Sequence, residues 1–313
     1  MWFKQIQYFN LKPGFPYQAE ALTAALEDLL FEPCLPSLPM AMGWVSPLDQ
    51  IDAPLVYAAN GYLMLCLQVE EKILPSTVVR QTLQDRIKVI EHTQGRKVPY
   101  KEKQALQADI IATLLPRAFS RFKRLYGYID TKRNALILNI AHPKEVGYFL
   151  NSWKKVLPEQ QLIAPELKDL NYMMTQWLQH HSHPACLEIE KACVLQDPSQ
   201  QSRTIRCQQQ NLAASAIQSL LTDGCQVEQI ALSWQERVSF TLNSEFSIRG
   251  LAFQDKLQAQ DEADGQSTQQ QFDIDFVLMT QAIAELMHDL LTVLAKEPKA
   301  VTKTLPHALE LVD

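Results

Sequence analysis

Glycine is scarce in this chain, and its scarcity excludes two common kinds of nucleotide site. The sequence has 9 glycines in 313 residues, and no two of them lie closer than 15 positions apart. A phosphate-binding loop of the form G-x-x-x-x-G-K and a dinucleotide fingerprint of the form G-x-G-x-x-G both need closely spaced glycines. An enzyme that depends on a mononucleotide or dinucleotide is therefore not expected, and no cofactor is predicted.

Long apolar runs and paired cysteines are also lacking. The longest apolar stretches, 61–67 and 276–279, fall well short of the ~20 residues that cross a bilayer. The first seven residues have no apolar core of the kind found in signal peptides. None of the 6 cysteines has C-x-x-C spacing, so we expect reduced and mostly buried thiols. These features predict a cytoplasmic protein without a membrane partner.

Charge is distributed very unevenly along the chain. The whole sequence is acidic, with a net charge of −6, yet residues 80–133 contain 13 basic and 5 acidic residues. This segment therefore carries +8, whereas the remainder carries −14. A basic segment within an acidic protein directs a polyanion to one surface, so we expect the polyanion site to lie here.

The apolar periodicity predicts an α+β fold of antiparallel sheets with packed helices and a projecting helical hairpin. A Pro-rich connection over 33–47 is expected to be a loop, and 255–271 to be a polar helix end and loop. Strands are predicted over 2–9, 61–69, 125–130, 135–141, 204–207, 227–233, 236–242 and 246–253. Helices are predicted over 18–31, 77–92, 102–115, 144–156, 166–180, 212–222 and 274–295.

Several short blocks, in order from near the N-terminus to the last predicted helix, resemble one protein family. These blocks are Met42–Val45, Ala59–Gly61, Glu70–Ser76, Leu114–Phe122, Ala231–Arg237 and Phe272–Thr280. Together they make the chain similar, over nearly its whole length, to the bacterial recombination-associated protein RdgC. None of the blocks is a catalytic motif.

The resemblance implies a function as well as an architecture. Members of this family form a ring-shaped homodimer with a positively lined hole, which binds double-stranded DNA with little sequence preference. They restrain the RecA recombinase by occupying DNA, and no enzymatic activity is implied. The resemblance thus implies a nucleoid-associated protein with a central domain (1–76 and 116–165), a basic hairpin tip (77–115) and a base domain (166–313).

Two groups of basic residues are the first candidates for DNA contact, since non-specific binding needs several Lys and Arg on one surface. Arg96, Lys97, Lys101 and Lys103 surround the predicted turn between two helices. Arg117, Arg121 and Arg124 follow at i, i+4 and i+7, which is one face if that segment is helical. The alternative is a solvated helical surface without a ligand.

The resemblance implies that Gln209 and Gln210 belong to the DNA surface. It also implies a difference between this chain and its relatives. Relatives carry lysines where Gln208 and Gln209 stand, and a basic residue where Cys225 stands. An amide brings no charge and releases no counterion, so we expect weaker or less salt-sensitive binding than in such relatives.

Phe119 lies between Arg117 and Arg121 and has two interpretations. It is either an aromatic side chain of the core or, as the resemblance implies, a dimer contact that closes the ring.

Two other groups of residues have the chemistry of a metal site but do not predict one. His180, His181, His183 and Cys186 offer zinc ligands, but their spacing matches no standard pattern and Pro184 indicates a loop. Asp255, Asp261, Glu262 and Asp264 would suit a metal-dependent nuclease, but their polar, Gln-rich surroundings favour a solvated loop. No metal and no catalytic residue is predicted. A nuclease and a regulator that contacts RecA directly remain the rival hypotheses.

Overall fold

A computed structural model describes residues 1–12, 18–48, 50, 52–254 and 268–296. Its strands are β1 (Gln5–Leu11), β2 (Met40–Val45), β3 (Tyr57–Ala59), β4 (Tyr62–Ile73), β5 (Phe119–Asp130), β6 (Ala135–Leu138), β7 (Leu162–Ile163), β8 (Leu187–Asp197), β9 (Gln200–Gln208), β10 (Gln226–Trp234), β11 (Val238–Asn243) and β12 (Ser247–Phe253). Its helices are α1 (Ala19–Glu27), α2 (Ser76–Gln94), α3 (Tyr100–Leu114), the 3-10 turn η1 (Leu115–Arg117), α4 (Pro143–Val156), α5 (Leu170–His180), α6 (Ser215–Thr222) and α8 (Thr268–Leu294).

One sheet runs through the whole molecule. Its strands follow the order β2-β4-β5-β6-β1-β12-β11-β10-β8-β9, with β3 beside β4 and β7 beside β1, and all of these pairings are antiparallel. The N-terminal strand β1 joins the two halves, because it pairs with β6 through Tyr8 and Ile137 and with β12 through Ile6 and Ile248. The predicted α+β class with antiparallel pairing is confirmed.

Hydrophobic side chains cover both faces of the half of the sheet that contains β2, β4, β5 and β6. Along β4, Tyr62 and Met64 belong to one buried cluster, whereas Leu63 and Leu65 belong to another. Successive side chains of a strand point to opposite faces, so a strand buried on both sides reads as a continuous apolar run. This explains why 61–69 is so apolar in the sequence.

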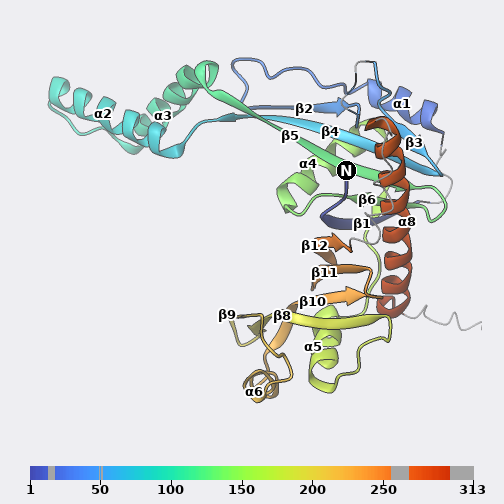
Figure 1. Ribbon diagram of the computed structural model, residues 1–313. Helices are drawn as coiled ribbons and strands as arrows, with labels where there is room; N and C mark the ends of the chain where they lie inside the picture. The colour runs from blue at the N-terminus through green and yellow to red at the C-terminus, as the bar shows by residue number, and fades with distance from the viewer. Residues whose placement is uncertain (13–17, 49, 51, 255–267, 297–313) are drawn as a thin grey trace, which may run out of the picture.

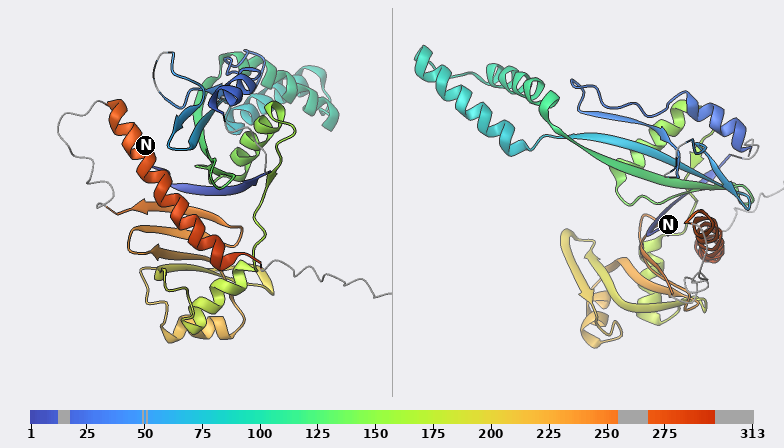
Figure 2. Two further views of the ribbon diagram at one scale, coloured as in Figure 1. Left: turned by 90° about the vertical axis from the view of Figure 1, so that its right-hand side faces the viewer. Right: turned by 45° about the horizontal axis from the view of Figure 1, so that its top comes forward.

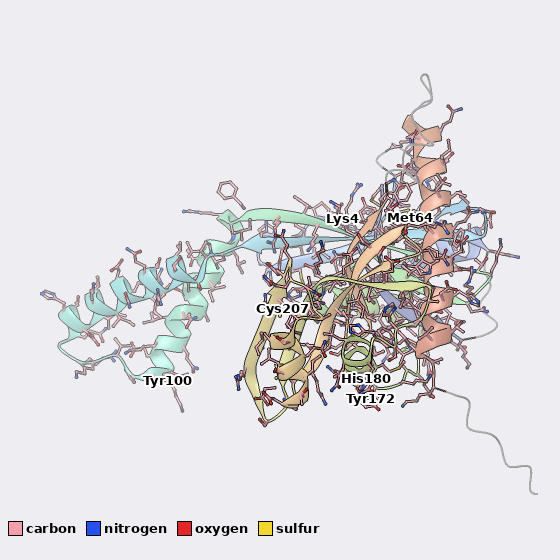
Figure 3. All side chains as sticks on the ribbon, turned by 60° about the horizontal axis from the view of Figure 1, so that its bottom comes forward. Lys4, Met64, Tyr100, Tyr172, His180 and Cys207 are labelled. Atoms are coloured by element: carbon pink, nitrogen blue, oxygen red, sulfur yellow. The ribbon has the colours of Figure 1, made fainter. Side chains whose placement is uncertain are left out.

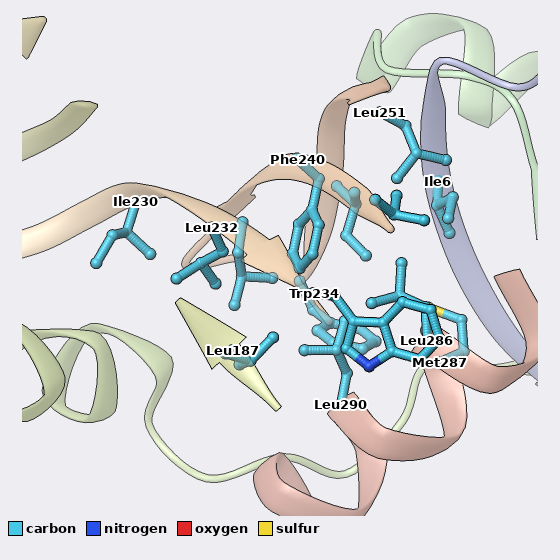
Figure 4. Close-up of a cluster of buried hydrophobic side chains, with 14 of the residues drawn as sticks. Ile6, Leu187, Ile230, Leu232, Trp234, Phe240, Leu251, Leu286, Met287 and Leu290 are labelled. Carbon is cyan, nitrogen blue, oxygen red and sulfur yellow. The ribbon is translucent and has the colours of Figure 1, made fainter. Parts of the chain in front are cut away.

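The long helix α8 crosses one face of the sheet diagonally, from the level of β3 to that of β8 (Figures 1 and 2). Near its start Phe276 contacts Tyr62 of β4 and Tyr128 of β5. Leu286, Met287 and Leu290 pack against the buried Trp234, whose indole nitrogen donates to Asp289 at 2.9 Å (Figure 4). Residues 270–294 have the length and mean hydropathy, 1.3, of a membrane-spanning helix. Because one side of this helix fills the protein core, its apolar composition has a structural explanation.

Strands β4 and β5 extend beyond the body of the sheet and carry a helical hairpin. Their register is unbroken from Tyr62–Asp130 to Ile73–Phe119. We call residues 76–114, which form α2, the turn and α3, the basic hairpin. It projects to one side of the molecule (Figures 1 and 2), and its turn is formed by Gly95 in the left-handed conformation, φ 63°.

Most predicted elements are present, and several expectations were wrong. Residues 40–45 form strand β2 rather than a loop, because this segment pairs with β4 from Met40–Glu71 to Val45–Cys66. Strands β3, β7 and β8 were not predicted, and α5 begins at Leu170 rather than at 166. The prediction for 255–271 lies largely outside the described residues, and α8 already begins at Thr268. The predicted domain limits remain a prediction. One sheet contains strands from both sides of the predicted limit at 165–166.

Candidate nucleic-acid interface

The turn of the basic hairpin brings together the first group of predicted DNA-binding residues. Proline-capped α3 begins directly after this turn, so Lys101 and Lys103 lie in its first turn, beside Arg96 and Lys97. Figure 3 shows Tyr100, the first residue of α3, on the projecting hairpin and away from the body of the protein. The sequence prediction of a basic cluster at this turn is confirmed as geometry.

The four cations at the turn are not equivalent. Arg96 donates two hydrogen bonds to Glu102, at 2.7 and 2.9 Å, and this carboxylate raises the pKa of the guanidinium. Lys97, Lys101 and Lys103 form no ion pair with another described residue. The lysines are therefore available to a ligand, whereas Arg96 is engaged in an ion pair with Glu102 at the protein surface.

Arg117 and Phe119 lie at the opposite end of α3. Pro116 ends the helix in the 3-10 turn η1, and Arg117 is exposed there without an ion pair in the described part of the chain. Because α3 has 15 residues, Arg117 is about 20 Å from the turn at 1.5 Å per residue. The cations without an ion pair thus lie at both ends of α3 rather than in one cluster.

The interpretation of Arg117, Arg121 and Arg124 as one helical face is wrong. Residues 119–130 form strand β5, in which alternate side chains point to opposite faces. Arg121 therefore shares a face with Phe119 and Lys123, and Arg124 points to the other face with Phe122. The strand arises because this segment pairs with β4 along its full length.

Arg121 belongs to an ion-pair network on the face of the sheet that α4 covers. Its guanidinium donates to Glu71 at 2.8 Å, and Lys144 at the start of α4 reaches the same carboxylate at 3.1 Å. Both bonds lower the pKa of Glu71, that from Arg121 more strongly. Lys123 similarly donates to Glu145. Lys144 is a basic residue near Arg121 that the sequence analysis missed, and no sequence signal places α4 against this strand.

The opposite face of the same strands is covered by the chain around residues 31–34. Phe122 contacts Phe31 edge to face at 6.5 Å between ring centroids. Glu70 is 4% exposed and accepts from the Cys34 amide at 2.7 Å. Hydrogen bonds from Ser120 and from this amide, with Lys72 nearby, hold the pKa of Glu70 below its ordinary value.

Phe119 is the most exposed large hydrophobic residue among those described, at 85%. It faces Ile73 across the two strands, and Ile73 is itself about half exposed. The interpretation of Phe119 as a core side chain is therefore wrong for a single chain. An exposed aromatic beside an exposed aliphatic residue is the composition expected of a protein contact.

Gln209 and Gln210 lie in the other half of the molecule, directly after the edge strand β9. All three of Gln208, Gln209 and Gln210 are exposed, and Gln209 has a left-handed backbone, φ 52°. Gln209 and Gln210 line a hollow together with Lys191, a basic residue that the sequence analysis did not select. Cys225 differs, because its side chain is buried and is not part of an exposed surface.

The two halves present these groups on the same side of the protein. In Figure 1 the chain has the outline of a letter C, in which the basic hairpin and the β9–α6 region form the ends and α8 forms the back. The structure does not bring Gln209 and Gln210 into contact with the hairpin cations within one chain.

The remaining candidate groups do not assemble into a metal centre in the described structure. His180 ends α5, His181 follows with φ 51°, and burial raises the pKa of the Cys186 thiol. Among described residues, no group of three or more His, Cys, Asp or Glu side chains is placed to hold a metal ion. Asp255, Asp261, Glu262 and Asp264 lie outside the described residues.

Comparison with known proteins identifies the family. Residues 1–297 match the sequence model of a family described as "Putative exonuclease, RdgC". The chain belongs to the RdgC family. The expected resemblance is thereby confirmed over nearly the entire sequence.

Curated RdgC proteins align with the chain along nearly their whole length. A relative from Aeromonas hydrophila is 32% identical over 303 residues, which are 96% of this chain and 100% of the relative. Relatives from Halorhodospira halophila and Yersinia pestis are 33% and 32% identical, covering 93% and 95% of this chain and 97% and 99% of their own. All three bear the name recombination-associated protein RdgC, so membership associates this chain with recombination.

Proposed function

We propose that this RdgC family member is a non-enzymatic protein that binds double-stranded DNA without sequence preference and limits recombination by RecA. It would act as a homodimeric ring around the duplex, associated with the nucleoid in the cytoplasm. The observation that carries the proposal is the set of exposed cations without an ion pair among the described residues: Lys97 and Lys101 at the hairpin turn, and Arg117 at the other end of α3. Such cations contact phosphates and release counterions, and they require no base-edge geometry.

A second copy of the chain supplies the other half of the ring in this proposal. The C-shaped outline leaves one side open (Figure 1). The exposed Phe119 and Ile73 are the first residue of β5 and the last of β4, at the root of the hairpin. Burying these side chains in a symmetric contact would remove apolar surface from water, at about 25 cal/mol per Å². The basic hairpins of two copies would then face one duplex from both sides.

Occupation of DNA is the proposed means of limiting RecA. A protein that surrounds the duplex withholds it from the recombinase without any direct contact between the two proteins. The alternative regulator, which contacts RecA directly, predicts inhibition that does not depend on the cations of the hairpin.

A DNA-cleaving activity is the second candidate, because the family description names an exonuclease. It predicts shortened strands when the protein is incubated with linear duplex and Mg²⁺ or Mn²⁺. DNA that stays intact over long incubation would reject this candidate.

The proposal is tested by binding of the full-length protein to fluorescent linear duplexes across a salt series, with the solution mass measured in parallel. We expect the mass of a dimer, affinity that falls steeply with salt, and equal affinity for unrelated sequences. A monomer without salt-sensitive binding would reject the ring.

Charge reversal separates occupation of DNA from direct contact with RecA. The variant carries Lys97→Glu, Lys101→Glu and Arg117→Glu, and it leaves Arg96 and Arg121 in their ion pairs so that the hairpin stays folded. Occupation predicts that DNA binding and inhibition of RecA are lost together. Inhibition that survives the loss of DNA binding would favour direct contact.

A further inference from the structure

Two cysteines occupy directly opposite positions on adjacent strands at the edge of the sheet. Cys193 of β8 is the register partner of Cys207 of β9. Directly opposite residues of an antiparallel pair have Cα atoms ~4.5–5.5 Å apart. A disulfide requires a Cα separation of ~4.4–6.8 Å, so the backbone already has the spacing of a cross-strand disulfide.

The two thiols touch one another but differ in environment. Cys193 is 3% exposed and belongs to the hydrophobic core, whereas Cys207 is half-buried. Burial, together with the neighbouring Cys207, raises the pKa of the Cys193 thiol to about 12. Cys207 is therefore the thiol that an oxidant meets, and Cys193 is the protected one behind it.

Cys207 gives small molecules access to this pair, because it is only half-buried and lies on β9, the last strand of the sheet. The other cysteines of the described chain have no such opposite partner in the sheet register.

We propose that Cys193 and Cys207 are an oxidation site that forms a reversible disulfide and clamps the edge strand β9 to β8. Hydrogen peroxide is the oxidant. The Cys207 thiolate attacks one peroxide oxygen, the O–O bond breaks, and hydroxide leaves and takes up a proton to become water. The sulfenic acid on Cys207 is then attacked by the sulfur of Cys193, which releases a second water and gives up its proton.

The clamp acts on a strand that only one neighbour holds. Strand β9 ends the sheet, so its other edge has no strand partner among the described residues. A covalent link at Cys207, near the end of β9, restrains the segment that leads to the exposed Gln208, Gln209 and Gln210. Oxidation therefore reduces opening of β9 without changing the rest of the fold.

The test is treatment of the full-length protein with hydrogen peroxide, followed by intact mass and peptide mapping without reductant. Trypsin separates Cys193 in peptide 192–203 from Cys207 in peptide 207–237, but the second peptide also contains Cys225. The mapping is therefore done in a Cys225→Ser background and, because this buried site could resist substitution, also in the natural sequence with a second protease that cleaves between 207 and 225.

The expected result is a mass lower by two hydrogen atoms, a linked pair of these peptides, and return to the starting mass with a thiol reductant. Hydrogen exchange in 200–208 should slow in the oxidised form. Cys207→Ser should abolish the link, whereas Cys186→Ser, the matched control at the other half-buried cysteine, should leave it intact. Links that scatter among other cysteines, or sulfinic acid on Cys207 without a link, would overturn the proposal.

Discussion

Removal of two unpaired lysines at the hairpin turn gives the sharpest test of the DNA-binding surface. The variant is Lys97→Ala with Lys101→Ala. Both side chains are exposed and form no ion pair with a described residue, so the loss of either changes folding stability by at most about 0.5 kcal/mol. An effect on DNA binding would then reflect the missing charges alone.

The size of the effect follows from counterion release. Each phosphate contact contributes about 0.9 to the slope of log affinity against log salt. Lys97, Lys101, Lys103 and Arg117 would contribute a slope of about −7 in a dimer with both hairpins on one duplex. The variant should reduce this slope to about −3.6. Between 50 and 200 mM salt the unaltered protein should therefore lose about 150-fold more affinity than the variant loses.

The assay is fluorescence anisotropy of a labelled duplex at several salt concentrations, with melting temperatures to verify folding. The matched control is Lys168→Ala with Lys296→Ala, which removes the same charge near the C-terminal end of α8. Lys168 there donates only to the Val293 carbonyl, at 3.3 Å. The control should keep the full slope. Equal slopes for both variants would refute the reasoning, because net charge rather than a defined surface would then govern binding.

Three further predictions concern the dimer, the glutamines and acid stability. Phe119→Ala should weaken dimerisation in sedimentation experiments while leaving the secondary structure unchanged by circular dichroism, because the Phe119 side chain is largely exposed in one chain; an unchanged dimer constant would exclude Phe119 from the contact. Gln208→Lys with Gln209→Lys should steepen the salt slope by up to about 1.8 per chain, and an unaltered slope would place both residues away from DNA. The lowered pKa of Glu70 means that its ionised form stabilises the fold fully above the ordinary value of 4.5, and that this contribution is lost as pH falls through the lower folded-state pKa. Glu70→Gln should therefore lower stability at neutral pH and flatten its decline in acid, which denaturant titrations at several pH values would detect.

The basic segment illustrates how far sequence reasoning reached. Apolar residues at helical spacing and the glycine between them were enough to predict α2, the turn and α3, because a short connection between two amphipathic helices produces a hairpin. The cluster of Arg96, Lys97 and Lys101 at that turn followed directly. The ion pairing of these residues could not be predicted from the sequence, because Glu102 pairs with Arg96 through a geometry that only the folded turn creates.

Strand β5 shows where local patterns failed. Arg117, Arg121 and Arg124 have spacing that suits a helix, and Pro116 is compatible with a helix start. Arg117 nevertheless lies in the 3-10 turn η1, and 119–130 is a strand, because its twelve residues pair with β4. Only its second half, 125–130, was predicted as a strand. Pairing between residues 46 to 68 positions apart is a tertiary interaction, and intrinsic preference does not report it.

The sequence by itself determined the α+β class, most of the elements, the location of the excess positive charge and, through its motif blocks, membership of the RdgC family. These properties depend on composition and on periods of two or 3.6 residues, which are local. Only the tertiary structure decided that Phe119 is exposed, that Cys225 is buried, that Arg121 is held by Glu71, and that Cys193 faces Cys207. Each of these depends on which distant segments the sheet brings side by side, and burial and ion pairing exist only after that choice is made.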